Sequence, residues 1–493
     1  MNGDFLEQGQ ALQGGVFQGT LTNKEAEDLS KALTAGYPAG AQASGLVGGG
    51  VLQVESLEAT LKSVTFEQKN LVFWPAVPTN KAFATVEQYS RLIGYGSGAN
   101  PYFAEGGTPG EEDSTYVRDT QKIVYFGTKR KVTHPMMLVR THTGDVVAQQ
   151  TKEGTMWLLK SIERELYWGN GNFSNYGEFD GHLSAIPQTS LAMNGLQQQL
   201  LRGSSDVQQQ AGDFQGYGID KAIYKDVRGA SLQHDDVEDS ALAVFENFGM
   251  ANEMHLEPAA LSAFSKIFYP KERINNMGVP EGRAGFVLRE FVSSAGTISM
   301  KPNVFLRPAQ KLDPYLPQQN APATPTVAAP ADGAVPAGVV STDFVNGEVY
   351  IYQVVAVNDR GRSTPVTSAA VTIVADGHQV SMVINATVGA KSYDVYRTAA
   401  GGLAASAQFI GSVAPISVGG AVTFYDRNRK LPGLGEAYLM TMAAENLEVK
   451  QLTPLSKINL AITSASLEWF MLIYMALIVY TPRKNFILRN VGR

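Results

Sequence analysis

The sequence predicts an α+β fold in which an antiparallel β-sandwich is inserted into a larger domain. Three observations lead to this prediction. The first half of the chain shows a long hairpin pattern followed by one long helix. In the second half, a proline-rich segment is followed by short strands separated by regular turns. Finally, the chain of 493 residues is too long for one core, because domains usually contain ~100–200 residues.

Residues 1–66 are expected to form an N-terminal arm with a short helix. The first 50 residues are rich in glycine, alanine, glutamine and serine and show no sustained periodicity. We expect one short helix within residues 24–33 and a second within residues 51–64, where apolar residues recur at helical spacing. Residues 71–77 predict a strand ended by Pro78. An arm of this composition gains structure only by lying on neighbouring molecules.

Residues 67–141 are expected to form a long hairpin with flanking strands. Residues 83–93 and 116–132 are rich in β-branched and aromatic residues, and a polar tip with six glycines between Gly94 and Gly110 separates them. Such a tip cannot pack a core, so it is costly in a monomer unless another subunit covers it. The candidate contact residues are Tyr95, Tyr102, Phe103, Glu111, Glu112, Asp113, Lys129, Arg130 and Lys131. The charged residues among them can either dock on a neighbouring subunit or simply face solvent, and the sequence leaves both alternatives open.

Residues 142–312 contain the two strongest helical patterns. In the first, Asp145 to Trp168, Asp145 is placed as the cap and the glycines from Gly169 onward end the helix. Its apolar face is expected to consist of Val147, Leu158, Ile162 and Leu166. The second pattern, Asp235 to Phe248, places Val237, Ala241, Val244, Phe245 and Phe248 on one stripe.

Residues 313–435 are expected to form the insertion. The proline-rich segment 313–342 predicts a linker and the entry to a domain. Between Glu348 and Tyr425, short runs such as VYIYQVVAV and SYDVYR alternate apolar and polar residues, as an antiparallel β-sandwich requires. Residues 436–493 then return to the style of the first half, with strands around residues 437–442, 447–452 and 471–480.

No pattern in the sequence indicates catalysis, a cofactor or a metal. The chain contains no cysteine, and its six histidines form no HExxH or His-x-His pattern. Glycine-rich stretches such as GYGSGANPYF lack the Lys-Ser/Thr of a phosphate-binding loop. A net charge of −6 argues against tight binding of nucleic acid. The N-terminus has no secretory pattern, and the apolar run at residues 470–480 is too short to span a membrane, which requires ~20 residues.

The order of the elements resembles that of the major capsid proteins of tailed phages, which have the Johnson fold. It comprises a polar arm, a hairpin with a glycine-rich tip, a long helix, a second helix and strand, and a β-rich C-terminal half. The resemblance implies that residues 81–139 are the extended loop and residues 145–168 the spine helix of the peripheral domain. It further implies that GEFDGHLSAIP at residues 177–187 is the turn after this helix, and that residues 235–268, 298–308 and 472–491 complete the peripheral and axial domains. The inserted segment YIYQVVAVNDRGRSTP at residues 350–365 resembles a fibronectin type III or immunoglobulin-like domain.

The resemblance implies a structural protein, not an enzyme, that assembles as pentamers and hexamers into an icosahedral head around double-stranded DNA. The implied partners are other copies of the chain and portal, scaffold and decoration proteins, with the packaged DNA contacted only non-specifically. The implied location is the virion capsid, assembled in the host bacterial cytoplasm. Two alternatives stay open at this point: an encapsulin-type compartment shell and an adhesion or binding protein with an immunoglobulin-like domain.

Overall fold

The computed structural model describes most of the chain after residue 66. The described residues are 67–96, 102–139, 144–169, 192–203, 224–272, 288–306, 321–335, 343–358, 361–415, 418–428, 430–462 and 464–492. Apart from Gly144, all of them belong to one compact unit that spans Ser63–Val139 and Asp145–Arg493. The predicted arm and its helices, and the predicted turn at residues 177–187, lie outside the described residues.

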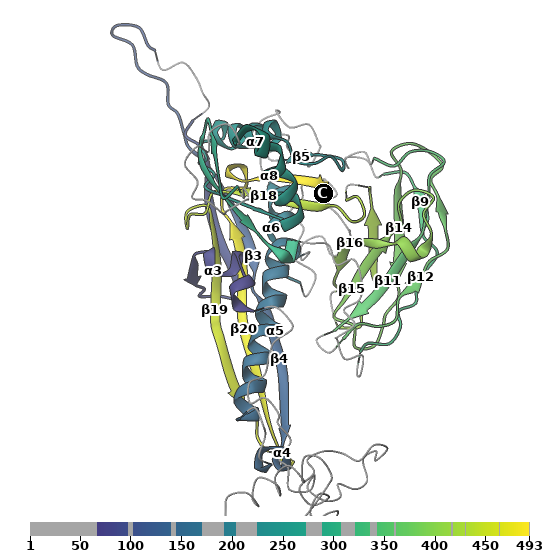
Figure 1. The fold of residues 1–493 in the computed structure, drawn as a ribbon. Coiled ribbons are helices and arrows are strands. Elements are labelled where there is room, and N and C mark those ends of the chain that lie inside the picture. Colours follow the sequence, from purple (N-terminus) through teal and green to yellow (C-terminus); the bar gives the residue numbers. More distant parts are fainter. Residues whose placement is uncertain are drawn as a thin grey trace, which may run out of the picture. The chain divides into compact units, whose positions relative to one another are not determined.

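The first part of the fold consists of a four-stranded sheet with one long helix packed on it (Figure 1). The strand order is β1 (Thr79–Lys81), β19 (Leu447–Asn459), β20 (Ser466–Val479) and β4 (Val124–Thr133). β1 runs parallel to β19, and the other neighbours are antiparallel. Helix α5 (Val146–Trp168) lies against this sheet along β4 and β20, with the shorter α6 (Leu196–Gly203) also packed on β20. Two short helices, α3 (Phe73–Ala76) and α4 (His134–Leu138), and the 3-10 turn η2 (Gln68–Asn70) flank the sheet strands in the sequence.

Helix α5 starts and ends where the sequence predicts. The Asp145 side chain accepts a hydrogen bond from the Val147 N–H at 2.9 Å and so caps the first turn. At the other end, a Cβ atom on Gly169 would lie 2.2 Å from the Met193 carbonyl oxygen, so only glycine fits there. Leu158, Ile162 and Leu166 are buried, as the predicted apolar face requires.

The second part of the fold consists of a six-stranded mixed sheet with two helices packed on it. Its order is β5 (Tyr224–Asp226), β21 (Phe486–Val491), β18 (Gly435–Met440), β6 (Glu253–Leu256), β8 (Gly296–Pro302) and β7 (Glu290–Ser293). Helices α7 (His234–Glu246) and α8 (Pro258–Glu272) share one apolar core with this sheet. The 3-10 turns η4 (Val304–Leu306) and η6 (Pro482–Lys484) follow β8 and precede β21. The C-terminal strands β18, β19 and β20 confirm the strands predicted after residue 435.

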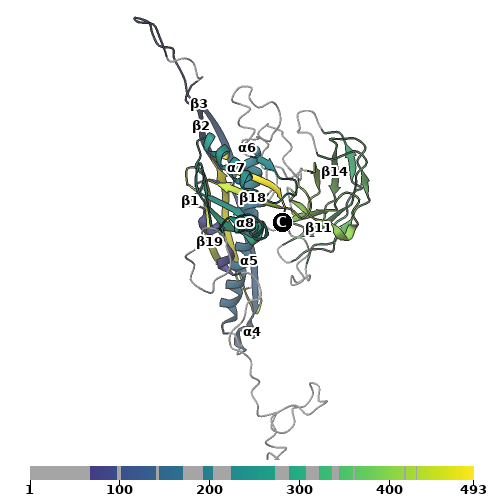
Figure 2. The ribbon, with the colours of Figure 1, turned by 45° about the horizontal axis from the view of Figure 1, so that its top comes forward.

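The strands predicted between Glu348 and Tyr425 are present and form a β-sandwich (Figure 2). One sheet has the order β12 (Val366–Thr367), β11 (Tyr352–Val357), β15 (Ser392–Arg397) and β16 (Gln408–Val413). The facing sheet has the order β17 (Val422–Asp426), β14 (Gln379–Ile384) and β9 (Ala331–Gly333), and β10 (Val349–Tyr350) pairs with β13 (Val371–Thr372). A 3-10 turn, η5 (Ala404–Ser406), precedes β16. The sandwich has an apolar core of its own, and its kinship with immunoglobulin-like domains stays a prediction.

The hairpin predicted from strands at residues 83–93 and 116–132 is wrong in its second strand. The hairpin consists of β2 (Val86–Gly94) and β3 (Thr115–Lys122), whereas β4 leaves it and pairs with β20. Ile123 lies between the end of β3 and the start of β4, and its side chain is fully buried against Ala82 and Ala476. Burial of this one side chain fixes the point at which the chain changes sheets.

Two further predictions are wrong for local reasons. Residues 71–77 form no strand, because the backbone N–H groups of Val72, Phe73 and Trp74 all bond to a buried carboxylate and the chain turns into α3. The second predicted helix ends at Glu246, so Phe248 lies beyond it and is exposed. Phe245 lies within the helix but is exposed as well, because the buried face is centred on Val237, Ala241 and Val244.

Candidate assembly interface

The β2–β3 hairpin projects from the fold as a two-stranded ribbon with no core of its own (Figure 1). Its strands pair antiparallel from Val86 opposite Lys122 to Gly94 opposite Thr115. Three aromatic side chains near the tip face solvent: Tyr95 and Tyr102 are each 85% exposed and Phe103 is 59% exposed. Isolated two-stranded hairpins are marginally stable in water, and exposed aromatics of this kind favour a surface that another molecule covers.

The base of the hairpin is held firmly, in contrast to its tip. The rings of Tyr89 and Tyr480 meet edge to face, with their centroids 5.1 Å apart. The buried Gln121 accepts a hydrogen bond from the Asn194 side chain at 2.8 Å. These contacts fix the start of the ribbon, and fixing one end of a docking segment lowers the entropic cost of docking it.

The charged residues predicted as contacts lie in two different places. Glu111, Glu112 and Asp113 are exposed near the hairpin tip. Lys129, Arg130 and Lys131 lie in β4, in the four-stranded sheet, and not along the hairpin as predicted. The ammonium groups of Lys129 and Lys131 lie 2.5 and 2.9 Å from the Glu468 carboxylate, and these two hydrogen bonds lower the pKa of Glu468 to about 2.

The four-stranded sheet has a second apolar face, turned away from α5, that sequence reasoning missed. Phe470, Leu472 and Tyr474 alternate along β20 with the residues that contact α5. Tyr125, which is 57% exposed, packs edge to face on Tyr474 at 4.8 Å between centroids. The Leu472 side chain covers Gly127. A Cβ atom on Gly127 would lie 2.5 Å from the Cδ2 atom of Leu472. We call this the outer sheet face; its members are Tyr125, Ile458, Phe470, Leu472 and Tyr474.

A buried carboxylate fixes the segment that leads into the hairpin. Glu163 of α5 is fully buried and accepts hydrogen bonds from the backbone N–H groups of Val72, Phe73 and Trp74 at 2.8–3.1 Å. The Asn303 side chain donates a further hydrogen bond at 2.8 Å. The carboxylate thereby joins α3, α5 and the end of β8, and we call it the Glu163 latch.

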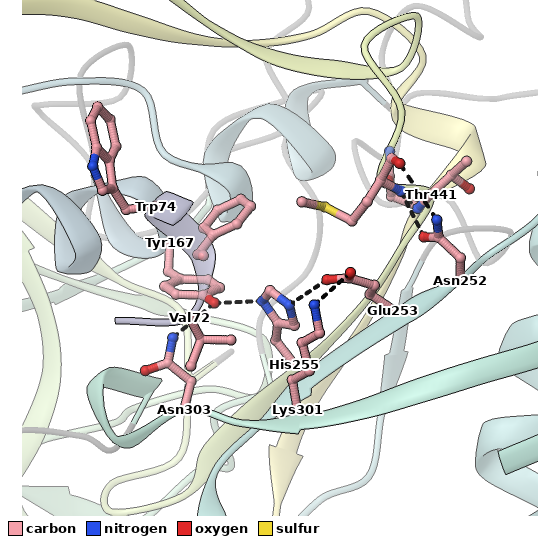
Figure 3. Close-up of polar contacts among 12 residues, drawn as sticks. Val72, Trp74, Tyr167, Asn252, Glu253, His255, Lys301, Asn303 and Thr441 are labelled. Carbon is pink, nitrogen blue, oxygen red and sulfur yellow. Dashed lines mark hydrogen bonds and ion pairs between the residues drawn. The ribbon is translucent and has the colours of Figure 1, made fainter. Parts of the chain in front are cut away.

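A chain of hydrogen bonds continues from the latch to the second sheet (Figure 3). Asn303 donates to the Tyr167 hydroxyl at 3.0 Å, and this hydroxyl lies 2.7 Å from His255 Nδ1. His255 Nε2 lies 3.1 Å from Glu253, whose other oxygen accepts from Lys301 at 2.6 Å. Burial lowers the pKa of His255, and the hydrogen bond from His255 is the main cause that lowers the pKa of Glu253 to about 2. A neutral His255 that donates through Nε2 and accepts through Nδ1 satisfies every group in this chain.

The C-terminal end of α5 contacts the sandwich through stacked rings and cations. Trp168 stacks on Phe409 at 5.3 Å between centroids, and the Lys430 ammonium lies 3.3 Å from the centre of the Trp168 ring. Arg164 lies over the other ring, Phe409, at 5.1 Å. Cation–π contacts in desolvated positions are worth ~2 kcal/mol. The sandwich is therefore attached to α5 by specific contacts as well as by its two linking segments.

One carboxylate at this junction, Glu165, is expected to make the stability of the subunit depend on pH. The Glu165 Oε2 atom is enclosed without a hydrogen-bond partner, and burial raises the pKa of Glu165 to about 7. Because the fold favours the protonated form of Glu165, its contribution to stability is fully present below pH 4.5, the ordinary pKa. This contribution is lost as the pH rises through 7. We expect Glu165→Gln to gain ~1–3 kcal/mol in the free energy of unfolding at pH 8 and almost nothing at pH 4, measured by urea unfolding. Equal effects at both pH values would contradict this assignment.

Among the described residues, no group of three or more acidic or histidine side chains could hold a metal ion. No helix in the described part of the chain is long and apolar enough to cross a membrane. The structural features that stand out are instead a projecting hairpin, an apolar sheet face and buried polar groups that fix their positions.

A projecting hairpin and a second apolar sheet face favour a structural protein that associates with other chains through extended surfaces. The family model of the SU10 major capsid protein matches residues 17–322, which is more than half of the chain. The protein belongs to the SU10 major capsid protein family and is a major capsid subunit of a phage head.

Individual relatives are distant in sequence. The major capsid protein of Staphylococcus phage K is 22% identical over 475 residues, covering 94% of this chain and 95% of the relative. Among solved structures, the capsid of cyanophage P-SCSP1u has a TM-score of 0.43 at 8% identity and covers 93% of this chain and 100% of that one. The encapsulin complex of Synechococcus elongatus has a TM-score of 0.37 at 11% identity, over 91% and 97% of the two chains. The family assignment rests on the family model, which describes a phage capsid protein and favours neither the encapsulin nor the adhesion alternative.

Proposed function

We propose that the subunit assembles as pentamers and hexamers into an icosahedral shell, and that the hairpin tip of one copy docks on the outer sheet face of a neighbour. The observation that carries this proposal is the exposure of Tyr95, Tyr102 and Phe103 on a ribbon that has a rigid base and no core. Closed symmetric assemblies need such complementary patches on each subunit. Many modest contacts of this kind sum to a stable shell.

The outer sheet face fits the tip in both polarity and charge. Its aromatic and aliphatic side chains, of which Tyr125 and Ile458 are exposed and the others half-buried, match the aromatic residues of the tip. Beside it, two lysines share one glutamate, so Lys129, Lys131 and Glu468 together carry one net positive charge opposite an acidic tip. Charges at the rim of an interface guide orientation more than they add affinity.

The proposal also assigns a region of a capsid subunit to each remaining part of the chain. In this proposal, residues 1–66 are an N-terminal arm, residues 67–141 hold the extended loop, and residues 142–312 hold the spine helix with the peripheral domain and the first part of the axial domain. Residues 313–435 are the inserted sandwich, facing outward or bracing neighbours, and residues 436–493 complete the peripheral and axial domains. The shell encloses double-stranded DNA with only non-specific contact, and portal, scaffold and decoration proteins join it in the host cytoplasm.

Deletion of residues 94–113 tests the proposed role of the hairpin. We expect a folded, soluble subunit that no longer assembles, because the described residues of the tip lie outside the apolar cores of the subunit. Sedimentation measures assembly, and circular dichroism with thermal unfolding measures folding. A matched control is Val388→Ser, since Val388 is equally exposed but lies in the sandwich. Normal assembly of the deletion variant, or loss of its fold, would exclude the proposed role.

A further inference from the structure

Charged and aromatic side chains make the contact between α5 and the sandwich. Arg164 and Trp168 lie one helical turn apart on α5 and both reach Phe409 of β16. Arg164 also faces the carboxylate of Asp394, in β15, at 3.9 Å. Lys430, in the segment that leaves the sandwich, is buried with its ammonium 3.3 Å from the centre of the Trp168 ring. We call this contact the α5–sandwich joint.

One carboxyl group at the joint is enclosed without a donor that would stabilise its charge. Glu165 follows Arg164 in the sequence and lies one helical turn before Trp168. Its Oε2 atom is enclosed, and no hydrogen-bond partner for it lies among the described residues. The backbone of the next turn closes over this oxygen, since a Cβ atom on Gly169 would lie 3.0 Å from it. A carboxyl group enclosed in this way is stable only while it carries a proton.

The charges around Glu165 do not replace the water that the joint excludes. In the described part of the chain, the titratable and charged groups at the joint and beside it are Arg164, Arg362, Asp394, Tyr396, Lys430 and Glu436. Residues 192–195, which bond to Gly169 through Gly195, add no charge. Burial raises the pKa of Glu165 to about 7; the Arg164 guanidinium opposes this rise and the Asp394 carboxylate adds to it. Burial therefore decides the protonation of Glu165.

We propose that the α5–sandwich joint is a pH-sensitive joint, closed while Glu165 carries a proton and shifted towards an open state when Glu165 ionises. Opening gives the ionised carboxylate the water that the closed joint excludes, and local openings of this kind need only part of the fold to move. The closed state holds the proton more tightly, so the ratio of open to closed subunits rises with pH. It rises by about tenfold per pH unit between pH 4.5 and 7 and levels off above 7. This inference concerns the single subunit and does not depend on shell assembly.

Acylation of Lys430 measures the opening, because its side chain is buried in the joint and becomes accessible when Trp168 and Phe409 separate. The dissociated full-length subunit is treated briefly with the N-hydroxysuccinimide ester of acetic acid at pH 6 and pH 8, and mass spectrometry locates the modified lysines. Lys152, exposed on the same helix, is the internal reference that removes the pH dependence of the reagent. We expect the ratio of Lys430 to Lys152 modification to rise by about tenfold from pH 6 to pH 8 in the wild type.

Uncharged variants of Glu165 assign the effect to this one group. In Glu165→Gln the ratio should be the same at both pH values, whereas Glu153→Gln, which changes an exposed carboxylate on the same helix, should keep the tenfold rise. Circular dichroism checks the fold, and Glu165→Met is a second uncharged variant with the same expected result. A wild-type ratio that stays level, including one in which Lys430 is never modified, would show that the joint does not open when Glu165 ionises. An equal rise in the uncharged variants would assign the opening to another group and overturn the inference.

Discussion

Glu163→Ala is expected to lower the free energy of unfolding by about 3–5 kcal/mol, one of the largest effects of any single substitution in this subunit. The substitution leaves three backbone N–H groups, at Val72, Phe73 and Trp74, and the Asn303 side chain without their acceptor. Each unsatisfied buried donor costs ~1–3 kcal/mol, although local opening of α3 recovers part of this. Urea unfolding monitored by circular dichroism measures the loss.

Two comparisons make the Glu163 prediction specific. Glu153→Ala changes an exposed carboxylate on the same helix, which accepts hydrogen bonds from the Gln149 and Gln150 side chains, and should cost less than ~0.5 kcal/mol. Hydrogen exchange in Glu163→Ala should accelerate first in residues 71–77, since the latch holds that segment to α5. A loss of stability similar to that of Glu153→Ala would show that the latch does not hold this segment.

Arg397→Met is expected to have an effect of similar size, about 3–5 kcal/mol, confined to the sandwich. The Arg397 guanidinium is fully buried and donates to Asp426 at 2.6 Å and to Asn428 at 2.6 Å. Removing it leaves the Asp426 carboxylate buried without its cationic partner. Calorimetry should show a lowered transition for the sandwich, with hydrogen exchange in α5 unchanged.

A double-mutant cycle tests whether the Arg397 effect comes from the ion pair. Asp426→Asn alone should also destabilise the sandwich, because it leaves the buried guanidinium unpaired. The two substitutions together should cost clearly less than the sum of the single effects, since the double variant, unlike each single variant, leaves no isolated buried charge. Simple additivity would show that Arg397 acts through its packing on Phe344 and Tyr350 and not through Asp426.

The parts of the fold that local chemistry determines could be predicted from the sequence. Asp145 and Gly169 set the ends of α5 through a side-chain cap and a close approach that only glycine allows. The sandwich strands alternate apolar and polar residues because one face is buried. The separation of β3 from β4 could not be predicted, because it depends on burial of Ile123 against a strand more than 350 residues later in the chain.

The candidate interface was only partly accessible to sequence reasoning. The exposed hairpin aromatics were found because glycine and polar residues surround them. The outer sheet face was missed because both faces of β20 are apolar, so Phe470 and Leu472 give no alternation against Met471 and Ile473. The Glu163 latch was missed because an acidic residue in an amphipathic helix usually faces solvent, and its partners lie about 90 residues earlier in the chain.

The central claim is that this subunit forms closed assemblies through its hairpin and outer sheet face. Negative-stain electron microscopy of the purified full-length protein, with sedimentation to weigh the species, tests it most directly. We expect shells, tubes or rings of five and six subunits for the wild type, and none of these for the variant that lacks residues 94–113. A wild-type protein that stays monomeric or dimeric at every concentration, or identical particles from both proteins, would contradict it.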